Sequence, residues 1–197
     1  MTGRVKNGRA VMAGRREPRD SLDFYPTPAH ATHAIIPILK PHLRPFHSAF
    51  DPVCGQGAMA EPLREHFDTV FSSDIHPYGY GGVADFSDPD FWVETDWIFA
   101  NFPFNRSLEF TLRALDMARC GVAVFAQARW IETKGRYENL FRDRPPTYFC
   151  PFVERVTLLR GRLDPTVRTA TLYAWFCWVH RAKQHGQLRL IPPRRRP

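Results

Sequence analysis

The chain has 197 residues, of which 44% are hydrophobic and 24% are charged, a composition typical of one globular domain and unlike that of disordered or collagen-like proteins. Its net charge of +7 lies at the ends: residues 1–22 carry +4, residues 181–197 carry +6, and residues 23–180 carry −3. We therefore expect a folded body over 23–180, a flexible basic arm over 1–22 and a basic tail over 181–197, flexible from residue 184.

Several classes of protein are excluded by the sequence. No apolar run approaches the roughly 20 residues of a membrane helix, and no secretion signal follows the basic N-terminus, so we expect a cytoplasmic protein without a membrane contact. The cysteines form no CxxC pair, and the early histidines lack metal-ligand spacing, so we expect free thiols and no metal. These residues are Cys54, Cys120, Cys150 and Cys177, and His30, His33, His42 and His47.

Strands and helices alternate along the body of the chain. This alternation predicts an α/β fold with a doubly wound, mostly parallel seven-stranded sheet, and the last two strands, with no helix between them, predict an antiparallel edge pair. Ligands bind such sheets outside the carboxyl ends of the strands. We expect strands over 47–54, 69–75, 82–86, 97–99, 121–128, 153–159 and 170–179, and helices over 58–67, 107–119 and 131–141.

Two glycines follow the first expected strand, in the segment Asp51-Pro52-Val53-Cys54-Gly55-Gln56-Gly57. Glycines at this point let a ligand approach the backbone. The segment does not continue as a GxGxxG or a P-loop motif, which argues against a phosphate site. An ordinary strand-to-helix turn is the alternative interpretation.

Acidic residues end the second and third expected strands. Asp74 comes about 20 residues after the glycine loop, where a carboxylate takes both hydroxyls of a ribose. Asp85 followed by Phe86 suits an exocyclic adenine amine and a stacked base. A turn or cap aspartate beside a core phenylalanine is the alternative for each position.

The most specific feature is Asn101-Phe102-Pro103-Phe104 at the end of the fourth expected strand. Pro103 has no N–H, so the carbonyl of Phe102 can face a ligand without competition from a turn donor. The side-chain oxygen of Asn101 adds a second acceptor, and Phe104 offers a flat face for a ring.

These four segments, in this order, resemble the motifs of class I S-adenosylmethionine-dependent methyltransferases. They are most similar to the amino-methyltransferases with an (Asp/Asn)-Pro-Pro-(Tyr/Phe) motif, typified by DNA adenine N6-methyltransferases, including small phage-type enzymes. The segment Phe24-Tyr25-Pro26-Thr27-Pro28 resembles the one that such enzymes carry before the glycine loop. The resemblance spans about residues 23–180 and implies a Rossmann-like methyltransferase catalytic domain.

The resemblance implies that S-adenosylmethionine is the cofactor. Asp51 would receive the methionine amino group, Asp74 the ribose hydroxyls and Asp85 the adenine amine. The other implied contacts are Tyr25, Pro26 and Thr27 over the methionine end, Pro52, Gly55 and Gly57 in the loop, Ile75 and Phe86 against the adenine, and Asn101.

The resemblance also implies a catalytic motif: Asn101 and the carbonyl of Phe102 would hold the target amine, and Phe104 would stack on its ring, beside Pro103. The chain departs from the family where Phe102 replaces the first proline. We expect methyl transfer to adenine N6 in DNA, with an RNA base or a protein glutamine amide as the alternative. A methyltransferase-fold binding module without catalysis is the alternative of another class.

Target recognition has no separate domain in the sequence. The spacing between Gly57 and Asn101 is short, so the candidates are two basic segments that would meet phosphates near the strand ends, although ordinary solvated charge is the alternative. The basic ends of the chain would add a general attraction to nucleic acid. The candidate residues are Arg129, Lys134, Arg136, Arg142 and Arg144 in the first segment and Arg160, Arg162 and Arg168 in the second, with Trp130, Trp175 and Trp178 as base-stacking or, for the last two, core residues.

Overall fold

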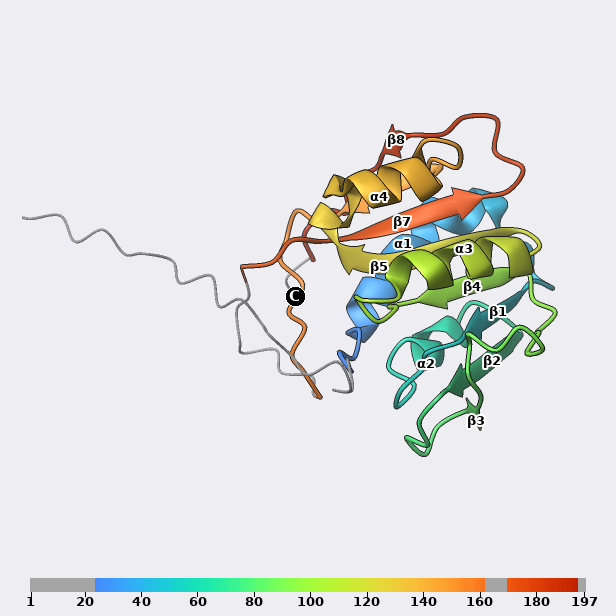
Figure 1. Cartoon of the computed structure of the whole chain (residues 1–197). Coiled ribbons are helices and arrows are strands. Elements are labelled where there is room, and N and C mark those ends of the chain that lie inside the picture. The colour runs from blue at the N-terminus through green and yellow to red at the C-terminus, as the bar shows by residue number, and fades with distance from the viewer. Residues whose placement is uncertain (1–23, 162–169, 195–197) are drawn as a thin grey trace, which may run out of the picture.

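The computed structural model describes residues 24–161 and 170–194, so the expected arm over 1–22 and the arginines at 162 and 168 lie outside the described residues. The strands form one eight-stranded sheet in the order β3-β2-β1-β4-β5-β7-β6-β8 (Figure 1). The strands are β1 (Ser48–Asp51), β2 (Thr69–Asp74), β3 (Gly82–Val83), β4 (Trp97–Ala100), β5 (Gly121–Gln127), β6 (Tyr148–Pro151), β7 (Tyr173–Val179) and β8 (Gln187–Leu188).

The sheet is mostly parallel, and β7 runs antiparallel to both of its neighbours, β5 and β6. The expected doubly wound α/β fold is therefore confirmed, with eight strands where seven were predicted. Helices pack on both faces of this sheet. They are α1 (Ala29–Leu39), η1 (Lys40–His42), α2 (Ala60–Leu63), α3 (Ser107–Met117), η2 (Ala128–Glu132), α4 (Lys134–Arg136) and the π-helical turn η3 (Tyr137–Phe141).

Two hydrophobic cores lie on opposite faces of the sheet, because successive side chains of a strand alternate between faces. In β4, Trp97 and Phe99 pack against α1 and α2, whereas Ile98 and Ala100 pack against α3. All four residues of β4 are buried, as expected for the central strand of a sheet covered on both sides. Figure 1 shows α1 and α3 on opposite sides of the central strands.

Helix α1 is absent from the sequence-based prediction, although it covers much of one face. Its buried residues Ala31, Ile35 and Leu39 recur every four positions and form one apolar stripe. Pro37 lies inside the helix and obscures this pattern, because proline removes a helical hydrogen bond. Trp175 ties the helix to the sheet, its Nε1 donating to the carbonyl of Ala31 at 2.9 Å.

The prediction of a strand over 153–159 is wrong. The strand that pairs with β7 on the side away from β5 is β6 (Tyr148–Pro151), where Tyr148 and Cys150 pair with Cys177 and Trp175. The segment 153–159 is irregular, and its buried Val156 and Leu158 join the core on the α1 face, which explains its apolar alternation.

The prediction that the chain is flexible from residue 184 is wrong for the last residues that the structure describes. Strand β8 pairs with β6, and Ile191, 2% exposed, accepts from Val153 N and donates to Pro151 O. Arg194 continues this edge through an ion pair with Glu154 at 3.2 Å. The arginines around this segment hide its short apolar pattern in the sequence.

None of the described helices has the length and apolarity needed to cross a membrane.

We expect Gly121→Ala to destabilise the fold by about 1–3 kcal/mol, because small residues enlarged in a packed core force their neighbours apart. A Cβ at Gly121 would lie 2.4 Å from the carbonyl oxygen of Trp178 and 2.5 Å from the ring of Trp97. The measurement is the free energy of unfolding in urea. Gly135→Ala is the control, because a Cβ there meets no described atom within 4 Å; equal losses in both variants would contradict the packing argument.

Candidate active site

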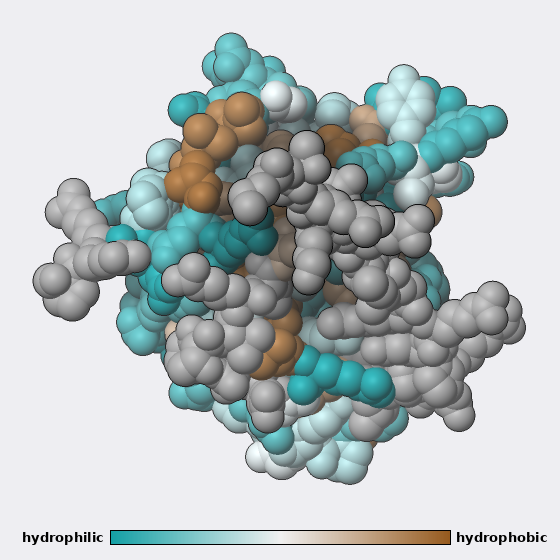
Figure 2. Space-filling view, turned by 90° about the vertical axis from the view of Figure 1, so that its left-hand side faces the viewer, coloured by the Kyte–Doolittle hydropathy of each residue, from teal (hydrophilic) through white to brown (hydrophobic). Residues whose placement is uncertain are grey.

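A cavity of about 980 Å³ lies where the parallel strands end. This is the edge at which ligands bind doubly wound sheets. Figure 2 views the molecule from this edge of the sheet, where hydrophilic and hydrophobic residues are both exposed. The sequence-predicted residues that line the cavity are Tyr25, Pro26, Thr27, Asp51, Pro52, Asp74, Ile75, Asp85, Phe86, Asn101, Pro103 and Phe104, together with Arg129, Trp130 and Arg136 from the segment proposed for target recognition.

Asp74 joins the loops that follow β1 and β2. Its Oδ2 accepts from the backbone N–H of Gly55 at 2.9 Å, and its Oδ1 accepts from that of His76 at 3.0 Å. Each carboxylate oxygen has a second lone pair, so the side chain can hold these loops and still accept from two hydroxyls of a ligand. The geometry is therefore compatible with the expected ribose contact.

Asp51 is the more deeply buried of the two buried acids that line the cavity, 2% exposed against 8% for Asp74. Burial, opposed by a hydrogen bond from Val53 N and reinforced by the negative charge of Asp74, raises the pKa of Asp51 to about 8. A cationic group placed beside Asp51 would favour its ionised form. The cavity beside Asp51 is therefore suited to an ammonium or a sulfonium group.

Asp85 has the opposite environment. Hydrogen bonds from the hydroxyl and backbone N–H of Ser87 hold its pKa below the ordinary value of an aspartate, so it is ionised at neutral pH. Both bonds end on Oδ1, and Oδ2 has no hydrogen-bond partner in the described part of the chain. Next to it, Phe86 is buried and stacks on Phe102, with ring centroids 5.8 Å apart.

Asn101 has a fixed orientation. Its Nδ2 donates to the backbone carbonyl of Tyr25 at 2.9 Å. A carbonyl can only accept, so this bond assigns the nitrogen and leaves Oδ1, which has no partner among the described residues, as an acceptor at the cavity. The ring of Phe104, 36% exposed, lies 5.9 Å from that of Tyr25. The acceptor and these two aromatic side chains thus line the same cavity.

Thr27 provides an independent sign of a ligand. Its side-chain oxygen is buried at the cavity wall and has no hydrogen-bond partner among residues 24–161 and 170–194. A buried hydroxyl left unsatisfied costs free energy, and a polar ligand that binds here would remove that cost. The expected residues Tyr25, Pro26 and Thr27 therefore fit one end of a polar cofactor.

Three residues of the predicted cofactor-binding and catalytic sets do not line the cavity: Gly55, Gly57 and Phe102. A Cβ at Gly55 would lie 2.3 Å from the ring of Phe24, and one at Gly57 would lie 2.6 Å from the ring of Tyr80. The glycines therefore admit aromatic rings of the chain itself. Both have positive φ angles, 52° and 85°, which supplies a second reason for glycine.

The basic residues of the first segment proposed for target recognition, 129–146, fall into two groups in the structure. Arg129 and Arg136 line the cavity, whereas Lys134, Arg142 and Arg144 lie outside its lining and pair with nearby acids. Arg106, which was not predicted from the sequence, lines the cavity, donates to Ser87 Oγ at 3.2 Å and pairs with Glu109 at 2.6 Å. Its position two residues after the 101–104 motif is the signal that could have found it.

The tryptophans are wall and core residues in this structure. Trp130 is 4% exposed and donates to Ser107 Oγ at 2.7 Å, which fixes its ring against the cavity. Trp175 and Trp178 are buried, as the apolar strand pattern predicted.

Comparison with known proteins establishes the fold. No protein-family model matches the chain, and no curated protein matches it in sequence. Many solved structures match it in three dimensions. A Pyrococcus horikoshii protein provisionally described as an RNA methyltransferase is 15% identical, with a TM-score of 0.62 over 82% of this chain and 87% of that one.

Two further structures share this fold. The methyltransferase subunit of a type I restriction-modification system from Streptococcus thermophilus is 8% identical, with a TM-score of 0.56 over 83% of this chain and 45% of the larger subunit. Magnesium protoporphyrin IX methyltransferase from Synechocystis, solved with S-adenosylmethionine bound, is 14% identical, with a TM-score of 0.50 over 77% and 78% of the two chains. The chain has the Rossmann-like methyltransferase fold.

We expect the free energy of unfolding of Asp51→Asn, relative to that of the wild type, to increase progressively as the pH rises from 5 to 8. The folded wild type keeps a proton on Asp51 up to about pH 8, whereas the unfolded chain loses it near pH 4, so wild-type stability falls with rising pH by up to about 1.4 kcal/mol per unit. Asparagine does not titrate.

The measurement is the difference in unfolding free energy between variant and wild type at several pH values, without ligand. Asp85→Asn is the control, because the lowered pKa of Asp85 confines its contribution to acid pH. A difference between Asp51→Asn and wild type that stays constant from pH 5 to 8 would contradict the assignment.

Proposed function

We propose that the protein transfers a methyl group from S-adenosylmethionine to an exocyclic amine, with adenine N6 in DNA as the favoured target. The observation that carries this proposal is the orientation of Asn101, whose Nδ2 is bound by Tyr25 and whose Oδ1 is left as an acceptor in the same cavity as Asp51, Asp74 and Asp85. The fold supports the proposal, since it is that of methyltransferases.

Each of the three acids would bind a different part of the cofactor. Asp51 would ionise to bind the ammonium of the methionine end, where the hydroxyl of Thr27 offers a further polar contact. Asp74 would hold the ribose hydroxyls, and Asp85 Oδ2 the adenine amine. S-adenosylmethionine, when bound, would supply a methyl group on a sulfonium: its S–CH3 bond would break as the N–CH3 bond forms, and the surplus proton of the amine would leave to solvent.

The residues at the end of β4 act on the nucleophile. An exocyclic amine is a poor nucleophile, because its lone pair is delocalised into the ring. Asn101 Oδ1 would accept one of its hydrogens, and the carbonyl of Phe102, which is bonded to the lining residue Pro103, would accept the other, although the side chain of Phe102 is outside the lining. Both bonds would favour a pyramidal nitrogen with a localised lone pair. Phe104 would fix the ring by stacking, so the site contributes positioning and electrostatics. A target in duplex DNA must first be flipped out of the helix.

Covalent catalysis by a cysteine is disfavoured. Cys54 is the cysteine that lines the described cavity, and burial, with the negative charges of Asp51 and Asp74, raises its pKa to about 12. A thiol with this pKa is not a nucleophile at neutral pH. The sequence also lacks the Pro-Cys order of a cytosine-C5 enzyme, which leaves direct transfer to nitrogen.

The target class is decided by a transfer assay with methyl-labelled S-adenosylmethionine and unmethylated DNA, total RNA or protein as acceptor. N6-methyladenine in hydrolysed DNA supports the proposal. An RNA acceptor is the second candidate, favoured by the Pyrococcus neighbour and by the departure at Phe102. Label only in RNA or in protein glutamine would replace DNA as the target, and cofactor binding without transfer would indicate a binding module.

We expect Asn101→Ala to lower the rate of methyl transfer by about 10²–10³-fold, the usual loss when one preorganised polar group of an active site is removed. Its affinity for S-adenosylmethionine, measured by calorimetry, should stay within a few-fold of wild type. Asn105→Ala is the matched control, because Asn105 also lines the cavity and follows the motif. Full turnover by Asn101→Ala would overturn its catalytic role.

We expect Arg129→Gln to weaken nucleic-acid binding and to reduce by about one the slope of log affinity against log salt concentration, as the loss of one phosphate contact does. Fluorescence anisotropy with a labelled duplex, at several salt concentrations, measures both quantities. Arg142→Gln is the control, since Arg142 is exposed, pairs with Asp143 and does not line the cavity. Equal slopes for the two variants would exclude Arg129 as a phosphate contact.

A further inference from the structure

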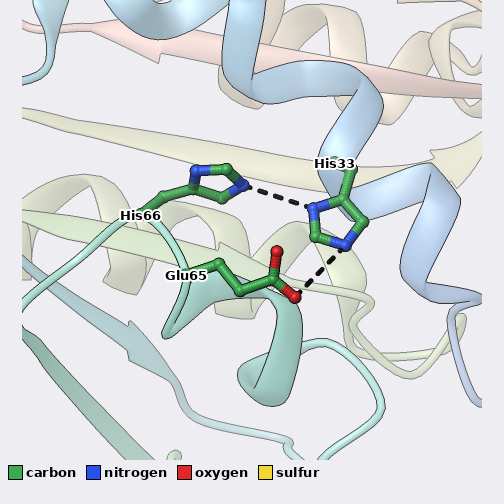
Figure 3. Close-up of side chains that lie close together, drawn as sticks. All are labelled: His33, Glu65 and His66. Carbon is green, nitrogen blue, oxygen red and sulfur yellow. Dashed lines mark hydrogen bonds and ion pairs between the residues drawn. The ribbon is translucent and has the colours of Figure 1, made fainter.

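Two histidines and a glutamate meet between α1 and the turn that follows α2, away from the residues that line the cavity (Figure 3). His33 Nδ1 lies 3.2 Å from His66 Nε2, and His33 Nε2 lies 3.7 Å from Glu65 Oε1. Each residue offers one ligand atom, and the three atoms lie within 4.8 Å of one another. The separation of 33 positions between the two histidines conceals this cluster in the sequence.

We propose that His33, Glu65 and His66 bind a divalent transition-metal ion, zinc being the best fit, which clips α1 to α2. Imidazole nitrogens and a carboxylate oxygen are ordinary zinc ligands. Zinc–nitrogen bonds of about 2.0–2.1 Å in tetrahedral geometry place two nitrogen ligands roughly 3.3–3.4 Å apart. The observed separation of 3.2 Å between the histidine nitrogens is close to that value.

The carboxylate of Glu65 would be the third ligand. Its side chain is 65% exposed, so it can leave His33 Nε2 and turn toward the two facing nitrogens at little cost. Arg64, the neighbouring cation, is engaged elsewhere: its Nε donates to the hydroxyl of Tyr80 and pairs with Glu61. Water would occupy the fourth position of a tetrahedral site.

A second cluster, formed by His47, Asp96 and Cys120, is not a comparable site. His47 Nδ1 accepts from Trp97 Nε1 at 3.1 Å and from the backbone N–H of Arg44 at 3.2 Å. These donors require the proton of the neutral ring to sit on Nε2, the nitrogen that faces Cys120. That nitrogen is therefore unable to bind a metal, whereas no backbone donor contacts the facing nitrogens of His33 and His66 in the described chain.

The position of the cluster gives the metal a structural role. Helix α1 follows Tyr25 and Thr27, and α2 follows the loop that begins at Asp51, so the clip would join the helices behind two walls of the cavity. Metal binding would stabilise the folded chain, because the unfolded chain lacks the preformed site.

The test is zinc titration of the untagged, chelator-treated protein by calorimetry, with Co²⁺ absorption to report tetrahedral coordination and thermal unfolding to report stability. We expect one zinc per chain and a higher melting temperature. His33→Ala and His66→Ala should each lower zinc affinity at least about 100-fold, because loss of a ligand exceeds the effect of losing an outer partner. His30→Ala, on the same helix, should bind as wild type does.

His66 is exposed, so its variant tests the site even if His33→Ala fails to fold. Absence of saturable zinc uptake by the wild type would overturn the proposal, as would equal affinity in the His66→Ala and His30→Ala variants. These measurements need no S-adenosylmethionine, so their outcome is independent of the proposed methyl transfer.

Discussion

The hydrogen bonds of Asp74 hold the site together. One carboxylate fixes the backbone after β1, through Gly55, and the backbone after β2, through His76. The loops that carry Asp51 and Ile75 therefore keep a constant separation, and the cavity between them has a defined width. Because Asp74 is itself 8% exposed, water competes little for these bonds, and they remain strong while lone pairs stay available to a ligand.

Charge is distributed within the cavity in a way that the net charge of the chain conceals. Asp51 and Asp74 end β1 and β2, whereas Arg129 and Arg136 come from segments that follow β5. Between them, Asp85 and Arg106 both bond the hydroxyl of Ser87, so charges of opposite sign also lie close together. In the proposed function the acids would attract the cationic cofactor, and the arginines would attract a phosphate.

The sequence predicted those parts of the fold and site that depend on short, continuous patterns. Buried strands such as β5 are apolar runs, and a polar residue at the end of a parallel strand must reach the common edge, so Asp51, Asp74, Asp85 and Asn101 could be placed together in advance. Contacts between distant segments could not. The ring of Phe24 over Gly55 and the pairing of β8 with β6 each depend on residues far apart in the chain.

The hydrogen bond between Asn101 and Tyr25 links the segment proposed to bind the cofactor to the side chain proposed to bind the target amine. The same short segment forms a wall of the cavity, where the methionine end of the proposed cofactor would lie, and orients the amide of Asn101, which would hold the proposed target. A displacement of this segment would change cofactor retention and acceptor geometry together. In the proposed function, a substitution that moves this segment would therefore change cofactor affinity and turnover together.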